Sequence, residues 1–260
     1  MEDEARISAF GRMMRKPWYA FWNLVQRVFY TGRAYPLAVP HGQRIYAPWF
    51  ESGSVFASLM TRARASGPMA VSRDRCFILY QLLRSCLLLP GDVVEFGVYT
   101  GGTATLIAEV MRAQKQEKRC LHLFDTFEGM PSLAVPERDY HSPGDFGDTS
   151  LEFVKGKRLA KFSSFCSFHQ GVMPDTFTEL PASQRFCFAH VDVDIYESVR
   201  VCFKFAWARL ETGGVILFDD YGFYPYRHAA RTAVDEFCDS QNIVLVALPT
   251  GQAFATKRER

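Results

Sequence analysis

Short runs of β-branched and aromatic residues alternate with longer stretches of helical spacing from about Asp92 to the end of the chain. This alternation predicts an α/β fold, in which a mostly parallel sheet is covered by helices on both faces. Seven strands are predicted, at residues 93–96, 121–125, 164–169, 186–192, 215–219, 243–248 and 252–256. The link Pro249-Thr250-Gly251 between the last two is short and turn-rich, so the sheet is predicted to end in an antiparallel hairpin.

Apolar residues recur at helical spacing in residues 103–113, 149–160, 196–210 and 229–240. The sequence Asp148-Thr149-Ser150 supplies an N-cap for the second of these helices. Residues 126–148 are rich in proline and glycine, so they are predicted to form a long irregular loop. Long loops in compact domains are often lids or binding loops.

The first 68 residues lack this alternation and are predicted to form a helical extension or lid, before a main domain at residues 69–260. One helical face of the extension is apolar and is formed by Trp18, Phe21, Trp22, Val25, Val28 and Phe29. Basic residues flank this face, as in helices that lie on a membrane surface. We favour packing on the core or on a second subunit, because large apolar side chains are mostly buried in proteins.

Charge and cysteine content narrow the class of protein. The net charge is +2 and the basic residues are scattered, which argues against a nucleic-acid partner. Seven cysteines without a CxxC pair indicate reduced thiols of a cytoplasmic protein. No apolar run approaches the roughly 20 residues of a membrane-spanning helix, and the acidic N-terminus is unlike a secretion signal.

The first predicted strand runs into a glycine-rich turn, Glu95-Phe96-Gly97-Val98-Tyr99-Thr100-Gly101-Gly102, and then into a helix. Glycines allow close backbone approach to a ligand, and a helix N-terminus offers free amide donors. The turn lacks the ending of a phosphate loop, and its spacing departs from GxGxxG. The carboxylate of Glu95 would repel a pyrophosphate but suits a cofactor that carries ammonium and sulfonium charges. A turn without any ligand is the alternative.

The next strand ends in Phe124-Asp125-Thr126-Phe127. An acidic residue at this place, shortly after a glycine turn, is positioned to bind ribose hydroxyls in a doubly wound fold. Asp125 is therefore predicted to bind the ribose of an adenosine cofactor.

Two acidic clusters end neighbouring strands, Asp192-Val193-Asp194 and Asp219-Asp220. Because the carboxyl ends of parallel strands meet in one crevice, these carboxylates are expected to converge. A hard divalent cation such as Mg²⁺ relieves the repulsion in such a cluster, and it stabilises the alkoxide of a bound hydroxyl. His169, at a strand end, is a candidate for adenine contact, and His190, inside an apolar strand, is interpreted as a hydrogen-bonded core residue.

The chain resembles the macrocin O-methyltransferase family in LPGDVVEFGVYTGGTA, LFDTFEGMP, GDTSLEFVK, HQGVMPDTFTELP, HVDVDIYESV and GGVILFDDYG. The resemblance spans about Leu89 to Gly222. It implies a Rossmann-like class I methyltransferase fold that binds S-adenosylmethionine and a divalent ion such as Mg²⁺. It also implies that Asp192, Asp219 and Asp220 hold the metal, that Asp192 is the general base, and it leaves the role of Asp194 open.

The same resemblance implies a set of cofactor-binding residues, in which Gln170 and Asp175 lie near the adenine and Ala70 and Val71 belong to a lid segment. The whole set is Ala70, Val71, Glu95, Gly97, Val98, Tyr99, Gly101, Gly102, Asp125, Thr126, Phe127, Ser150, Gln170 and Asp175.

Three functional hypotheses follow. The leading one is metal-dependent methylation of a hydroxyl on a small molecule, with a sugar moiety of a natural product or glycoconjugate as the favoured acceptor. Methylation of a phenolic, catechol-like hydroxyl is the second, with Trp18, Trp22 and Trp49 as an apolar clamp. A non-catalytic scaffold is the third, although an unused site has no reason to hold several mutually repelling carboxylates. The acceptor and self-association stay open.

Overall fold

The computed structural model describes residues 47–135 and 137–259, and the chain divides into two compact units, Met1–Ala57 and Ser58–Arg260. The predicted aromatic face at residues 18–29 and most of the predicted extension lie outside the described residues. Described residues near the unit boundary form the 3-10 helix η1 (Pro48–Phe50) and helix α2 (Val55–Ala65). The unit that carries the sheet begins at Ser58, ahead of the domain boundary predicted at residue 69.

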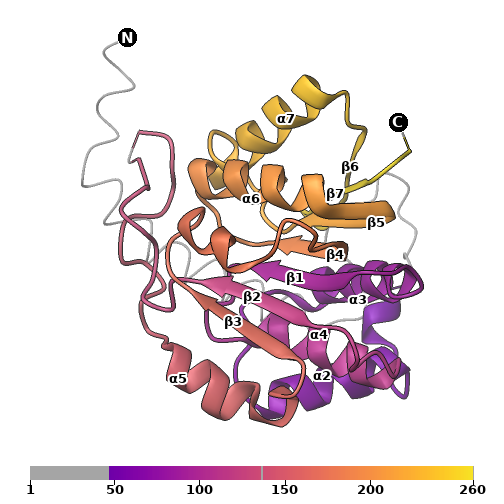
Figure 1. Cartoon of the computed structure of the whole chain (residues 1–260). Coiled ribbons are helices and arrows are strands. Elements are labelled where there is room, and N and C mark those ends of the chain that lie inside the picture. Colours follow the sequence, from indigo (N-terminus) through magenta and orange to yellow (C-terminus); the bar gives the residue numbers. More distant parts are fainter. Residues whose placement is uncertain (1–46, 136, 260) are drawn as a thin grey trace, which may run out of the picture. The chain divides into compact units, whose positions relative to one another are not determined.

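The second unit is built on one seven-stranded sheet in the order β3-β2-β1-β4-β5-β7-β6 (Figure 1). The strands are β1 (Asp92–Phe96), β2 (Leu121–Asp125), β3 (Cys166–Gln170), β4 (Phe186–Val191), β5 (Leu210–Phe218), β6 (Leu245–Ala247) and β7 (Ala253–Thr256). Strands β1 to β5 run parallel, whereas β7 is antiparallel to both β5 and β6. The seven predicted strands and the final antiparallel pair are confirmed.

Helices cover both faces of the sheet (Figure 1). Helices α6 (Tyr196–Arg209) and α7 (Ala230–Gln241) lie on one face, and α3 (Arg73–Cys86) and α4 (Gly102–Ala113) lie on the other. Sequence spacing predicted α4, α6 and α7 but not α2 and α3. Two short 3-10 helices, η4 (Asp175–Glu179) and η5 (Tyr224–Tyr226), complete the connections.

The single regular helix predicted at residues 149–160 is not present. It is divided into α5 (Leu151–Phe153), the π-helical turn η2 (Val154–Arg158) and the 3-10 turn η3 (Ala160–Phe162). Gly156 lowers helix propensity in the middle of the segment, and a π turn is common at functional sites. Ser150 is the N-cap, as predicted, and its hydroxyl accepts a hydrogen bond from the Phe153 amide at 3.1 Å.

Strand register aligns the carboxyl ends of β1, β2, β4 and β5. Phe96 is opposite Phe124 and Val191, and Val191 is opposite Phe218. The ladder continues one residue further, because the Asp192 amide donates to the Phe96 carbonyl at 2.9 Å and the Asp219 amide donates to that of Val191 at 3.0 Å. The predicted functional residues therefore meet at one edge of the sheet, where open α/β sheets bind their ligands.

Buried aromatic rings fix the strands below this edge. Phe96 stacks on Phe124 with ring centroids 5.3 Å apart, and Phe177 stacks on Phe205 at 3.9 Å. All seven cysteines are free thiols, as predicted. Within the described ranges, no helix is both long and apolar enough to cross a bilayer.

Candidate active site

The glycine-rich turn after β1 is in direct backbone contact with the acidic strand end of β4. Gly97 has φ +84°, and a Cβ atom added there would lie 1.8 Å from the Asp192 carbonyl oxygen. Any side chain at this position would therefore displace Asp192 or the turn. Gly101, at φ +78°, is the N-cap of α4 and directs the chain into that helix.

Asp125 holds the shape of the turn. Its Oδ2 accepts hydrogen bonds from the amides of Val98 at 2.6 Å and Tyr99 at 2.8 Å, and its Oδ1 accepts one from the Phe127 amide at 2.6 Å. Tyr99 and Phe127 have left-handed backbone conformations, φ 49° and φ 55°. Such conformations cost about 1–3 kcal/mol each and persist where neighbouring bonds enforce them, as these three bonds do.

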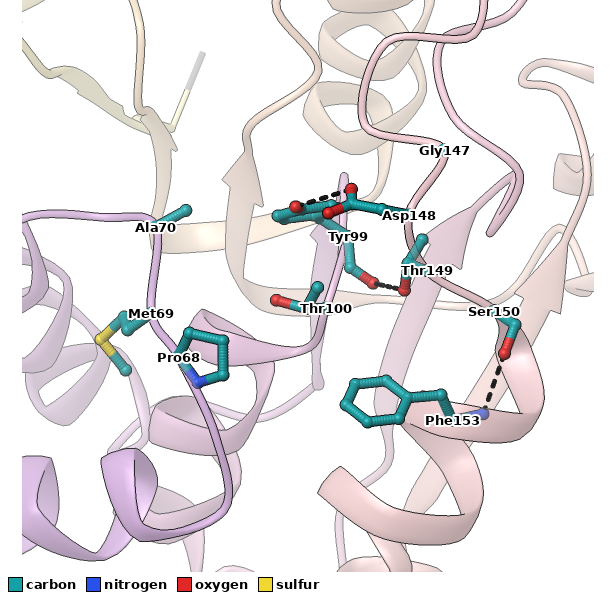
Figure 2. A pocket seen from close by; sticks show the side chains of 10 residues that line it. All are labelled: Pro68, Met69, Ala70, Tyr99, Thr100, Gly147, Asp148, Thr149, Ser150 and Phe153. Carbon is teal, nitrogen blue, oxygen red and sulfur yellow. Dashed lines mark hydrogen bonds between the residues drawn. The ribbon is translucent and has the colours of Figure 1, made fainter. Parts of the chain in front are cut away.

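A cavity of about 710 Å³ opens between the turn, the segment before α3 and the loop before α5 (Figure 2). Pro68, Met69 and Ala70 lie on one side, with Ser150 and Phe153 across from them. The full lining is Pro68, Met69, Ala70, Tyr99, Thr100, Gly147, Asp148, Thr149, Ser150 and Phe153.

Two hydrogen bonds connect Tyr99 to the loop before α5 along this cavity (Figure 2). The Tyr99 hydroxyl donates to Asp148 at 2.8 Å, and the Thr149 hydroxyl donates to the Tyr99 carbonyl at 2.8 Å. Burial and the neighbouring Asp148 carboxylate raise the pKa of Tyr99 to about 12, so the hydroxyl is a proton donor at neutral pH.

The predicted cofactor residues occupy three kinds of position. Ala70, Tyr99 and Ser150 line the cavity, whereas the predicted turn residues Gly97, Val98, Gly101 and Gly102 are not in its lining. Val71 and Phe127 are buried, and the Thr126 hydroxyl donates to the Gly129 carbonyl at 2.6 Å. Gln170 and Asp175 are exposed and lie outside the cavity lining, so their adenine role stays a prediction.

The acidic centre consists of Asp192, Asp194 and Asp220, each of which offers one carboxylate oxygen within 4.8 Å of those of the other two. Asp194 is held in the left-handed region at φ 55°. Burial raises the pKa of Asp192 and of Asp194 well above the usual value, and repulsion from the neighbouring carboxylates raises both further. Three mutually repelling oxygen ligands are the donor set that a hard divalent cation such as Mg²⁺ prefers, so these residues fit a metal.

Asp219 is held apart from this group. Its Oδ1 accepts from the Gln252 amide at 2.7 Å, and its Oδ2 is ion-paired with the Arg75 guanidinium. Burial alone would raise the pKa of Asp219, but the charges of Arg75 and His190 lower it. The acidic centre therefore contains Asp192, Asp194 and Asp220, whereas the predicted metal ligands were Asp192, Asp219 and Asp220.

A buried ion pair lies beneath both parts of the site. Glu95 and His190 are opposite each other in the register of β1 and β4, and His190 Nδ1 lies 3.0 Å from Glu95 Oε1. Burial disfavours the imidazolium, but Asp219 and Glu95 raise the pKa of His190 to about 9. His190 is therefore a hydrogen-bonded core residue, as predicted. The second oxygen of Glu95, Oε2, has no hydrogen-bond partner in the described part of the chain.

The long loop at residues 126–148 reaches the acidic centre, as a binding loop would. His141 Nε2 lies 2.9 Å from the Tyr226 hydroxyl and 3.9 Å from Asp194 Oδ1. His169 lies elsewhere: it is buried, stacks on Phe124 at 4.2 Å and pairs with Glu179 at 2.6 Å. It is not among the residues that line the cavity.

Sequence reasoning missed Arg75, His141, Arg158, Gln252 and Tyr226. None of them belongs to a motif with fixed spacing, and each reaches the site from a different element. The only signal available was placement: Arg75 and Gln252 follow the predicted lid segment and the final hairpin turn, respectively.

The curated proteins that are similar to this chain in sequence are described as O-methyltransferases. The chain is 30% identical over 157 residues to 8-demethyl-8-(2,3-dimethoxy-alpha-L-rhamnosyl)-tetracenomycin-C 4'-O-methyltransferase of Streptomyces olivaceus, covering 57% of this chain and 58% of that one. The chain spans about three-fifths of the length of the curated relatives it matches.

Solved structures confirm the class I O-methyltransferase fold. The O-methyltransferase NovP superposes with a TM-score of 0.62 at 21% identity, over 77% of this chain and 88% of that one. TomG of Streptomyces achromogenes, solved in complex with SAM, gives 0.52 at 14% identity, over 79% and 91%. The family described as Macrocin-O-methyltransferase (TylF) matches residues 83–246 of this chain. The chain belongs to that family.

Proposed function

We propose that this protein transfers a methyl group from S-adenosylmethionine to a hydroxyl of a small molecule, a sugar moiety of a natural product, with the help of a divalent cation such as Mg²⁺. One observation carries the proposal: a ligand-sized cavity, lined by Tyr99 and Thr100 of the glycine-rich turn, lies at the same sheet edge as a three-carboxylate centre, and Gly97 of that turn contacts the Asp192 backbone. The rhamnosyl group in the name of the Streptomyces olivaceus relative supports a sugar acceptor.

The cofactor half of the site has groups that fit S-adenosylmethionine. The unpaired Oε2 of Glu95 is a buried acceptor without a protein donor, which suits an ammonium group. Asp125 closes the strand next to the turn, at the place where ribose hydroxyls bind in this fold class. Ala70, Tyr99 and Ser150 would surround the rest of the molecule. When bound, the cofactor supplies a methyl group activated by the sulfonium charge.

The acceptor half of the site is the acidic centre. Asp192, Asp194 and Asp220 would hold the cation, which when bound lowers the pKa of a coordinated hydroxyl and orients it. Asp192, the predicted general base, would accept the hydroxyl proton on its carboxylate. His141 Nε2 lies 3.9 Å from Asp194 Oδ1 and 2.9 Å from the Tyr226 hydroxyl, so the long loop would lie beside a cation held there. Positioning and charge therefore supply most of the rate, because direct displacement needs no covalent help from the protein.

Isothermal titration of the purified protein with S-adenosylmethionine and S-adenosylhomocysteine, with and without Mg²⁺, tests the cofactor assignment. Binding of both in the micromolar range supports it, and no binding under either condition would return the scaffold hypothesis. A panel of rhamnosides and catechols, with products detected by mass spectrometry, then separates sugar from phenolic acceptors. Methylated rhamnoside without methylated catechol is the expected result.

A further inference from the structure

Arg158 is a fully buried cation that has no carboxylate partner among the residues that the structure describes. Its side chain is 0% exposed, and its Nη2 donates to the Pro68 carbonyl at 2.7 Å. Its Nε and Nη1 have no hydrogen-bond partner within residues 47–135 and 137–259. Burial lowers the pKa of Arg158, as desolvation does for any cation. An unpaired buried charge is strongly destabilising, so a function is needed to explain its presence.

Arg158 lies next to segments that line the cavity, although it is not itself in the lining. A Cβ added at Gly67 would lie 2.1 Å from Nη1, and one added at Gly101 would lie 3.5 Å from the Arg158 Cβ. The arginine is therefore enclosed between the segment before Pro68 and the turn that starts α4. Pro68 lines the cavity, as does Phe153 at the start of the same helical segment as Arg158 (Figure 2).

The start of α4 adds a second source of positive potential. Gly101, the N-cap, provides no side-chain acceptor for the first amides of this 12-residue helix. The unsatisfied amides and the helix dipole favour an anion nearby. Among the residues that line the cavity, Asp148 is the only one with a charged side chain, and its charge is negative.

The charge balance at this edge otherwise repels anions. Four carboxylates, Asp192, Asp194, Asp219 and Asp220, are gathered at the neighbouring strand ends, and with Glu95 they outnumber the cations Arg75 and His190 that pair with them. S-adenosylmethionine and S-adenosylhomocysteine each carry one anionic group, the carboxylate of the amino-acid end. That group needs local positive potential to bind beside so many negative charges.

We propose that Arg158, with the N-terminus of α4, selects ligands that carry this carboxylate. The inference rests on the proposed function, because it concerns the same cofactor cavity. Arg158 acts as a positioning residue through the Pro68 carbonyl and through its charge, without a direct contact to the reacting atoms. A protein carboxylate paired with the free nitrogens of Arg158 would cancel the positive potential that the guanidinium gives the cavity.

The test compares S-adenosylhomocysteine with its decarboxylated analogue by isothermal titration. The wild-type protein is expected to prefer the carboxylated ligand by about 10-fold or more. Arg158→Gln keeps a donor for the Pro68 carbonyl but removes the charge, so it should abolish the preference. Arg158→Lys keeps the charge and should retain most of it. Lys157→Met removes an exposed cation one residue away and should leave both affinities unchanged.

Other outcomes are decisive in the opposite direction. Equal weakening of both ligands in Arg158→Gln would make Arg158 a structural clamp and overturn the inference, while the proposed function would stand. Binding of neither ligand by the wild-type protein would overturn the proposed function itself.

Thermal denaturation of Arg158→Met guards against misfolding. The ligand-free variant should melt at the same temperature as the wild type or higher, because an unpaired buried charge has been removed. A large fall in melting temperature would again indicate a clamp.

Discussion

Two buried arginines lie at the two halves of the site, and their surroundings are opposite. Arg75 is ion-paired with Asp219 and lies 3.5 Å from Asp220, whereas Arg158 meets only a backbone carbonyl. Burial disfavours the charge in both, but the carboxylates raise the pKa of Arg75 and nothing compensates that of Arg158.

The two arginines show two ways in which a protein can hold a charged side chain, with a carboxylate partner or without one. At the acidic centre, the protein supplies both signs, so Arg75 holds Asp219 and leaves the other three carboxylates as a group. Beside the cavity, Arg158 has no carboxylate partner among the described residues, and two of its nitrogens are unpaired. The first arrangement stabilises the fold, and the second favours a ligand at a cost in stability.

The largest effect is expected from Asp192→Asn, which removes a member of the acidic centre. Turnover should fall by about 1,000-fold or more, since in the proposed function both cation binding and proton acceptance depend on this carboxylate. The affinity for S-adenosylhomocysteine should change by less than about 3-fold, because the cavity is lined by other residues. Asp239→Asn, on an exposed position of α7, is the matched control. Loss of ligand binding with the metal retained would contradict the division into two halves.

Arg75→Met tests the comparison at the arginine that has a carboxylate partner. The variant removes the arginine partner of the buried Asp219, so the free energy of unfolding in urea should fall by about 3 kcal/mol or more. Arg200→Met, which removes an exposed ion pair with Glu197, should change it by less than about 1 kcal/mol. If Arg75→Met were as stable as the wild type, the contrast with Arg158 would be unfounded.

Asp194→Asn sharpens the comparison through pH. The pKa of Asp194 is higher in the folded protein than in the unfolded chain. As the pH rises from the unfolded pKa through the folded pKa, the wild type therefore loses stability. Asparagine cannot ionise, and the metal-free variant should therefore be more stable than the wild type by about 1 kcal/mol near pH 8, and by less near pH 5. Denaturation in the presence of EDTA at both pH values measures this. A stability difference that does not vary with pH would show that Asp194 does not titrate in this range.

The smallest effect is expected from Tyr99→Phe at the cavity. The variant loses the hydrogen bond to Asp148 and keeps the ring, so the affinity for S-adenosylhomocysteine should weaken by about two- to five-fold. Titration calorimetry measures the change, with Tyr224→Phe, an exposed tyrosine of η5, as the control. A loss beyond about 30-fold would mean that the hydroxyl contacts the ligand itself.

The sheet was predictable because its signals are local. Strands such as 121–125 are short apolar runs bounded by turn residues, and parallel strands must end at one edge. The positions of Gly97, Asp125, Asp192 and Asp220 therefore followed from the sequence alone.

The charge partners were not predictable, because they depend on side chains from elements far apart in the chain. Arg75 lies on α3, whose buried residues have helical spacing, but that spacing does not show which carboxylate Arg75 meets, and its partner Asp219 is 144 residues away. The segment that ends in Arg158 has helical spacing, yet its π turn depends on enclosure by Gly67 and Gly101. No periodicity in the sequence records such enclosure.

The contact of Gly97 with Asp192 has a thermodynamic consequence. No flexible side chain separates the two backbones, so a displacement of one strand end is transmitted to the other without being absorbed. If a cation and a cofactor bind at the two halves of the site, any factor by which one changes the affinity of the other must be returned in equal measure. The absent side chain at position 97 therefore gives the two halves a direct backbone contact through which such a coupling could act.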